Sequence, residues 1–163
     1  MLHSPRRCSL DAPWIVLEKQ GMDIKHLTPA YAVSPQIAIE DLTFLADAGF
    51  RTVVNNRPDY EIPGHLACAE MRAAAKALGL AYVDNPVDGR VGITPDMIDA
   101  QKRAVDEATA PVFAYCASGT RSTIVWMIGQ APNTPSGELI AAAAAQGYDL
   151  AHMQPMLDSL YQG

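Results

Sequence analysis

Short apolar segments alternate with longer amphipathic segments over most of this sequence. The short segments are typical of buried strands and cover residues 31–33, 50–54, 80–83 and 111–115. The longer segments repeat apolar residues at helical spacing and predict helices over residues 39–48, 63–78, 94–108, 121–130, 138–146 and 151–161. Thr94-Pro95 adds an N-cap followed by proline at the first helical position, and glycines follow several of the predicted helices.

This order of strands and helices predicts an α/β fold. Parallel strands joined by helices need right-handed crossovers, which place helices on both faces of the sheet. We therefore expect a three-layer domain over residues 22–163, with a four- or five-stranded, mostly parallel sheet. Ligands of such sheets bind outside the carboxyl ends of the strands. Three unusually polar segments follow predicted strands, at residues 55–61, 84–93 and 116–122, and we expect them to form the site.

Composition and charge act mainly by exclusion. The 163 residues carry a formal net charge of −6, which argues against nucleic acid as a partner. No apolar run approaches the length of a membrane helix, and the run at residues 14–17 is too short for a secretory signal. The 3 cysteines lack metal-site or Cys-x-x-Cys spacing, which indicates a cytoplasmic protein with no metal or cofactor. Residues 1–21 show no clean periodicity and are expected to be a flexible leader.

Candidate chemistry is concentrated in residues 116–122. Cys116 follows a predicted strand, and Arg121 opens the next predicted helix. A positive charge at a helix N-terminus opposes the helix dipole, so Arg121 needs another role, such as binding an anion. The loop amides are expected to join it in an anion site; they belong to Ala117, Ser118, Gly119 and Thr120. This field favours the thiolate of Cys116, which predicts a nucleophile acting on a small anionic substrate rather than a buried spectator.

Other polar residues in the three segments each have two interpretations. Ser122 could cap the helix, donate a hydrogen bond to the Cys116 sulfur, or do both. Arg57 could pair with Asp59 or Glu61, or share in anion binding.

Arg90 could likewise help to hold an anionic substrate. Asp84 and Asp88 could act as general acids on a leaving group, or simply be the acidic residues that loops commonly carry.

The sequence resembles the phosphatase-like domain of the beta-lactamase-hydrolase-like proteins. The resemblance runs from about residue 22 to about residue 150 and rests on Cys-x-x-Gly-x-Arg-Ser at 116–122, Ser34-Pro35-Gln36, residues 49–59, residues 79–82, Pro86-Val87 and residues 147–149. It implies a cysteine-phosphatase-like fold, with the nucleophile at Cys116 and the anion-binding arginine at Arg121. Members occur alone or fused to persulfide dioxygenases or sulfide:quinone oxidoreductases, which implies a persulfide-handling partner enzyme.

Two departures from protein tyrosine phosphatases bear on the reaction. The loop has four residues between Cys116 and Arg121 rather than five, as in rhodaneses, and no aspartate matches the general acid with certainty. A sulfurtransferase that forms a Cys116 persulfide from thiosulfate or glutathione persulfide needs no strong acid, and is therefore the first expectation. The alternatives are a phosphatase that forms a cysteinyl-phosphate, and a non-catalytic anion-sensing module.

Overall fold

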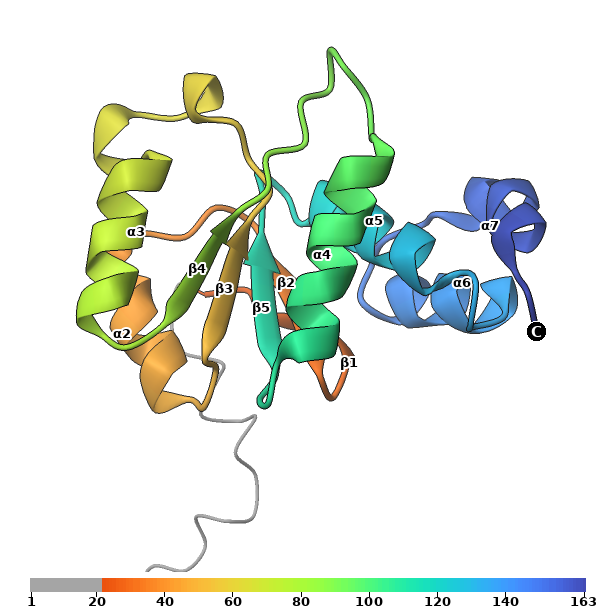
Figure 1. Ribbon diagram of the computed structural model, residues 1–163, viewed down its shortest axis with the longest axis horizontal. Coiled ribbons are helices and arrows are strands. Elements are labelled where there is room, and N and C mark those ends of the chain that lie inside the picture. The colour runs from red at the N-terminus through yellow and green to blue at the C-terminus, as the bar shows by residue number, and fades with distance from the viewer. Residues whose placement is uncertain (1–21) are drawn as a thin grey trace, which may run out of the picture.

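A five-stranded sheet with the strand order β1-β2-β5-β3-β4 forms the centre of the fold (Figure 1). The computed structural model describes residues 22–163, so the leader expected over residues 1–21 lies outside the described part of the chain. The strands of the sheet are β1 (Lys25–Thr28), β2 (Tyr31–Ser34), β3 (Thr52–Asn55), β4 (Ala81–Asp84) and β5 (Val112–Tyr115). Strands β2 to β5 pair in parallel, and only β1 is antiparallel, joined to β2 in a hairpin. The predicted α/β class with a mostly parallel sheet is confirmed.

Helices cover both faces of the sheet, as Figure 1 shows. The helices are α2 (Ile39–Asp47), α3 (Cys68–Ala77), α4 (Pro95–Glu107), α5 (Thr120–Gln130), α6 (Ser136–Ala145) and α7 (Gln154–Leu160). α2 and α3 lie on one face and α4 and α5 on the other, while α6 and α7 pack against α5. None of the helices described within residues 22–163 is both long and apolar enough to cross a membrane.

Among residues 22–163, three short 3-10 helices lie in the connections: η2 (Asp59–Glu61), η3 (Gly64–Leu66) and η4 (Ala151–Met153). The helix predicted over residues 63–78 is α-helical only from Cys68, and η3 occupies its first part. The Asp59 carboxylate accepts a hydrogen bond from the Cys68 backbone N–H at 2.8 Å, which satisfies one of the free amides where α3 begins.

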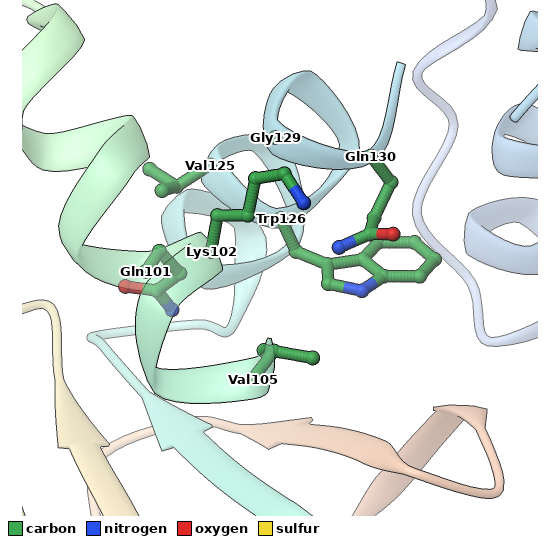
Figure 2. A pocket seen from close by; sticks show the side chains of 7 residues that line it. All are labelled: Gln101, Lys102, Val105, Val125, Trp126, Gly129 and Gln130. Carbon is green, nitrogen blue, oxygen red and sulfur yellow. The ribbon is translucent and has the colours of Figure 1, made fainter. Parts of the chain in front are cut away.

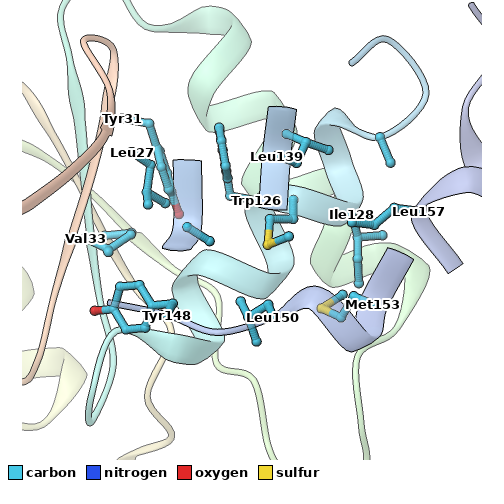
Figure 3. Packing of buried hydrophobic residues seen from close by; sticks show 14 of the residues in the cluster. Leu27, Tyr31, Val33, Trp126, Ile128, Leu139, Tyr148, Leu150, Met153 and Leu157 are labelled. Carbon is cyan, nitrogen blue, oxygen red and sulfur yellow. The ribbon is translucent and has the colours of Figure 1, made fainter. Parts of the chain in front are cut away.

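Alternating side chains of the central strand divide the core in two. Phe113 and Tyr115 are buried against the side of α2 and α3, whereas Ala114 faces the opposite cluster. In that second cluster Trp126 of α5 stacks on Tyr31 of β2, with ring centroids 5.4 Å apart and planes 8° from parallel (Figure 3). α5 is therefore fixed directly to the sheet.

Helices α4 and α5 meet along a narrow seam, seen in Figure 2. The helices lie close together at Gly129, where a Cβ would be in ordinary van der Waals contact, 3.5 Å from the Cβ of Lys102 and 3.7 Å from Cγ2 of Ile98. Gln101 lies on the same stretch of α4 but is only 1% exposed. The seam thus carries a buried polar side chain toward the sheet.

Candidate active site

The candidate nucleophile lies at the end of the central strand of the sheet. Cys116 follows β5, is fully buried, and its sulfur accepts a hydrogen bond from the Gly119 backbone N–H at 3.0 Å. Gly119 is the N-cap of α5 and has a φ of +96°, a backbone conformation that glycine adopts without strain. The loop therefore directs a backbone amide at the sulfur, where α5 begins.

Tyr148 supports this loop from outside. Its hydroxyl donates a hydrogen bond to the Ser118 carbonyl at 2.9 Å and lies where a side chain at position 119 would begin. Burial and the nearby Cys116 sulfur raise the pKa of Tyr148 to about 12, so its hydroxyl stays a donor. We did not single out Tyr148 from the sequence, although it belongs to the 147–149 segment that carries part of the resemblance.

The other loop residues predicted for anion binding lie between Cys116 and Arg121. The Ala117 carbonyl accepts a hydrogen bond from the Gln36 N–H at 3.4 Å. The side chain of Ser118 is exposed and donates to Thr120 Oγ1 at 3.0 Å. Ala117 and Ser118 thus form the exposed turn of the loop, while Gly119 is buried beneath it.

Ser122 is completely buried in the first turn of α5. Its backbone carbonyl accepts a hydrogen bond from the Tyr31 hydroxyl at 2.9 Å. Its side-chain oxygen contacts no hydrogen-bonding partner among the described residues, and Gly119 rather than Ser122 is the N-cap. The structure therefore shows neither the helix cap nor the hydrogen bond to the Cys116 sulfur that was expected of the Ser122 side chain.

Arg121 crosses from α5 to the two neighbouring polar segments. Its Nη1 donates to Glu61 Oε2 at 2.9 Å and to the Val87 carbonyl at 2.9 Å, and its Nη2 donates to Glu61 Oε1 at 2.8 Å. A guanidinium has five N–H donors in one plane, so these bonds use three of them. The Nε–H and one Nη2–H remain as a second, parallel pair. The Cys116 sulfur contributes to raising the pKa of Arg121, after the larger contribution of Glu61.

Glu61 is a site residue that was considered from the sequence only as a partner of Arg57. Arg57 Nε donates to Glu61 Oε1 at 3.1 Å, and Arg57 Nη1 donates to Gln36 Oε1 at 3.2 Å. The bonds from Arg121, followed by those from Arg57, hold the pKa of Glu61 below its usual value. The two arginines therefore share one carboxylate, and the segments that follow β3 and β5 are joined through it.

Asp88 and Arg90 form a separate group at the rim, in the segment after β4. The Asp88 carboxylate accepts hydrogen bonds from the Tyr60 hydroxyl at 2.7 Å and from Arg90 Nη2 at 3.0 Å. Arg90 also lies over the Tyr60 ring, 4.1 Å from its centroid. These bonds, above all those from Arg90, hold the pKa of Asp88 far below its ordinary value.

Asp84 lies on the other face of the sheet from Cys116. It follows Tyr82 by two residues, so both side chains lie on the side of α2 and α3, where Cys68 is its partner. Burial raises the pKa of Asp84. Cys116 follows Ala114 by two residues and interacts with Tyr31 of the opposite cluster. The structure therefore does not bring Asp84 and Cys116 together.

A buried polar network lies beneath the site, and it was not predicted from the sequence. Gln101 Oε1 accepts hydrogen bonds from the side-chain amides of Asn56 and Asn85, at 2.9 and 2.8 Å. Gln101 Nε2 donates to Asn56 Oδ1 at 3.0 Å and to the Tyr31 hydroxyl at 2.8 Å. Tyr31 in turn holds the Ser122 carbonyl. One side chain of α4 thus links the segments after β3 and β4 to the start of α5.

Within the described residues, His, Cys, Asp and Glu side chains form no group of three that could hold a metal ion. What converges at the sheet edge is a cysteine, two arginines and backbone amides, an arrangement suited to binding an anion.

The chain shares its sequence pattern with a family of known description. Residues 23–133 match the family described as the phosphatase-like domain of beta-lactamase hydrolase-like proteins. A beta-lactamase hydrolase-like protein of Agrobacterium fabrum is 37% identical over 99 residues, which are 61% of this chain and 23% of that protein. Another from Xylella fastidiosa is 32% identical over 131 residues, 79% of this chain and 30% of that protein. The chain thus spans less than a third of these relatives.

Solved structures share the fold of this chain, and some of them are described as phosphatases. A putative phosphatase from Neisseria meningitidis has a TM-score of 0.70 at 29% identity, over 85% of this chain and 99% of that one. PTPMT1 has a TM-score of 0.68 at 16% identity, over 84% of this chain and 92% of that one, and shows the fold alone. The fold is therefore of the cysteine-phosphatase type.

Proposed function

This chain belongs to the phosphatase-like domain family of the beta-lactamase hydrolase-like proteins, and we propose that it is a phosphatase that works through a cysteinyl-phosphate on Cys116. The observation that carries the proposal is the loop from Cys116 to Arg121, with the Gly119 amide on the sulfur and an arginine whose remaining N–H pair is available to an anion. The phosphatase descriptions of the family and of the Neisseria meningitidis structure support this alternative over the sulfur transfer that was the first expectation from the sequence.

In the first step the Cys116 thiolate attacks phosphorus. The S–P bond forms as the P–O bond to the leaving group breaks, and the leaving oxygen keeps the electron pair. Negative charge on the phosphoryl oxygens is met by the loop amides and by the free Nε–H and Nη2–H of Arg121. Glu61 and Val87 hold the other side of that guanidinium, so it is oriented before the substrate arrives.

In the second step water attacks the cysteinyl-phosphate. The P–S bond breaks, the thiolate of Cys116 is restored, and inorganic phosphate leaves with the water oxygen. The same amides and guanidinium act again, because the phosphoryl group passes through the same charge distribution.

Sulfur transfer is the second candidate, and one observation favours it. The Asp84 carboxyl lies on the far face of the sheet, and Asp88 is ion-paired to Arg90. Thiosulfate needs no acid: the Cys116 thiolate attacks its outer sulfur, a new S–S bond forms, and sulfite leaves with the electron pair of the broken one. The persulfide then passes its outer sulfur to an acceptor thiol.

A parallel assay separates the two candidates. Purified protein is incubated with an aryl phosphate or with thiosulfate, and the reaction is quenched in acid. The mass of the peptide that contains Cys116 is then measured by mass spectrometry. The phosphatase proposal expects phenol release and a phosphorylated peptide, both lost in Cys116→Ser. A sulfur adduct on Cys116 with thiosulfate, without any aryl phosphate turnover, would overturn it in favour of sulfur transfer.

A third outcome concerns the anion-sensing module expected as an alternative. If neither compound is turned over but inorganic phosphate raises the melting temperature, the site binds anions without catalysis, and the phosphatase proposal is wrong.

A further inference from the structure

We propose that this site acts on phosphoryl groups whose leaving group departs as a stable anion, namely phosphoanhydrides and acyl or aryl phosphates, and that it does not turn over alkyl phosphates. This inference rests on the proposed phosphatase function and narrows its substrate class. It follows from where the carboxyl groups around Cys116 lie.

The loop that follows β4 is already docked on the anion-binding arginine. Arg121 Nη1 donates to the Val87 carbonyl at 2.9 Å, and the Val87 N–H donates to the Asn56 carbonyl at 2.9 Å. The Val87 side chain is 2% exposed. Both backbone polar groups of the residue before Asp88 are thus hydrogen-bonded. The loop is therefore already closed over Arg121, and the position of Asp88 is not that of an open loop.

Within this docked loop, both carboxylate oxygens of Asp88 accept hydrogen bonds from neighbouring residues. Its Oδ1 accepts from the Tyr60 hydroxyl at 2.7 Å, from the Arg90 N–H at 2.8 Å and from Arg90 Nε at 3.2 Å, and its Oδ2 accepts from Arg90 Nη2 at 3.0 Å. A general acid must carry a proton, and four donors on one carboxylate favour the ionised form.

The other three carboxyl groups of the segments after β3 and β4 are no better suited. Asp59 caps α3 through the Cys68 amide, and Glu61 lies between Arg57 and Arg121. Asp84 has Cys68 as its partner on the opposite face of the sheet. Each carboxyl group in these two segments is therefore held as an anion or turned away from Cys116.

A leaving oxygen that receives no proton departs as an anion. When the S–P bond forms and the P–O bond breaks, the barrier then depends on how stable that anion is, because a positioned general acid ordinarily contributes about 10²–10⁴-fold. A phosphate or carboxylate anion leaves readily, whereas an alkoxide does not.

The test is the dependence of kcat/KM on the leaving group. The probes are a series of aryl phosphates with increasingly basic phenols, together with inorganic pyrophosphate and glycerol phosphate. We expect kcat/KM to fall steeply along the aryl series, pyrophosphate to be hydrolysed, and glycerol phosphate to be slower than the best aryl phosphate by more than about 10³-fold. Cys116→Ser measures the background for every probe.

Asp88→Asn and the matched exposed control Asp99→Asn are measured on the same series. We expect kcat/KM to depend on the basicity of the leaving group as steeply in both variants as in the parent protein. Two results would overturn the inference while the phosphatase function stands. One is a weak dependence of kcat/KM on the leaving group, with glycerol phosphate within about tenfold of the aryl phosphates. The other is a dependence that becomes steep only in Asp88→Asn. No turnover of any aryl phosphate would overturn both.

Discussion

Arg121 and Glu61 lie 60 residues apart in the chain and meet in a two-bond fork, Nη1 to Oε2 at 2.9 Å and Nη2 to Oε1 at 2.8 Å. The same carboxylate also accepts a hydrogen bond from Arg57, so its two oxygens connect the segments after β3 and β5. The orientation of the anion-binding guanidinium is thus set by a residue that does not belong to the cysteine loop.

Replacing Arg121 by lysine tests the fork itself. Lysine keeps the positive charge but cannot donate to Glu61 and to two phosphoryl oxygens in one plane, so we expect kcat/KM for an aryl phosphate to fall about 10²–10³-fold. Steady-state kinetics measure this. Arg57→Lys is the comparison and should lose far less; equal losses in both variants would mean that charge alone matters.

Replacing Glu61 by glutamine keeps the shape and removes the charge. Arg121 is then less firmly oriented, and we expect kcat/KM to fall while the protein loses about 1–3 kcal/mol of stability, as for hydrogen bonds to charged groups. Glu70→Gln on the exposed surface of α3 is the control; it should leave kcat/KM unchanged and cost less stability, about 0.3–1 kcal/mol for a charge in the first turn of a helix. A rise in kcat/KM in Glu61→Gln would show instead that Glu61 competes with the substrate for Arg121.

The same carboxylate predicts a pH dependence of stability. Arg121 and then Arg57 lower the pKa of Glu61 in the folded protein, so its contribution is present above the unfolded pKa, about 4.3, and is lost as the pH falls through the folded value. The gap in melting temperature between the parent and Glu61→Gln should therefore narrow as the pH is lowered below about 4. Thermal unfolding from pH 7 downward measures it; a gap that stays constant would contradict the assignment.

Gly119→Ala should destabilise the protein in two ways, through backbone strain and through a steric clash, and other variants of this chain can separate the two. The positive φ of +96° strains any side chain, and the new Cβ meets the Tyr148 hydroxyl. Gly49→Ala is the matched control, with a φ of +104° and open space around the position. We expect Gly119→Ala to lose about 2–4 kcal/mol, more than Gly49→Ala, and to lose activity as well. Tyr148→Phe in the Gly119→Ala background should restore part of the difference in urea unfolding.

Tyr31→Phe tests the buried network beneath the site. It removes the hydroxyl that joins Gln101 to the Ser122 carbonyl, at a cost of about 1–2 kcal/mol. Tyr82→Phe removes a buried hydroxyl pair with Tyr115 on the other face of the sheet and should cost a similar amount. Only Tyr31→Phe should lower kcat/KM. An equal effect of the two variants on kcat/KM would leave the network a purely structural role.

The elements of this fold could be predicted because their apolar residues are local and periodic. β1 was missed because Leu27 is the one buried residue of Lys25–Thr28, so the strand has no apolar pattern of its own. The start of α3 was placed too early because residues 63–67 keep apolar character while Asp59, outside the pattern, fixes the helix start at Cys68.

The site could be predicted only as far as strand ends determine it. That residues 55–61, 84–93 and 116–122 meet follows from a parallel sheet, and the contacts of Arg121 with Glu61 and Val87 confirm that they do. The pairing of Arg121 with Glu61 could not be foreseen, because it depends on the turn of η2. Gln101 resembles any polar residue of an exposed helix face until its side chain is seen to be buried against Tyr31, Asn56 and Asn85.

The central place of β5 has a consequence for hydrogen exchange. β5 pairs with β2 and β3, while β1 and β4 are the two edges. Edge strands can open locally, but β5 releases its amides only when two ladders separate, which approaches global unfolding. The amides leading to Cys116 should therefore exchange among the slowest in the protein, and those of the edge strands β1 and β4 should exchange faster. The edges of the sheet can open and close many times while the nucleophile stays in place.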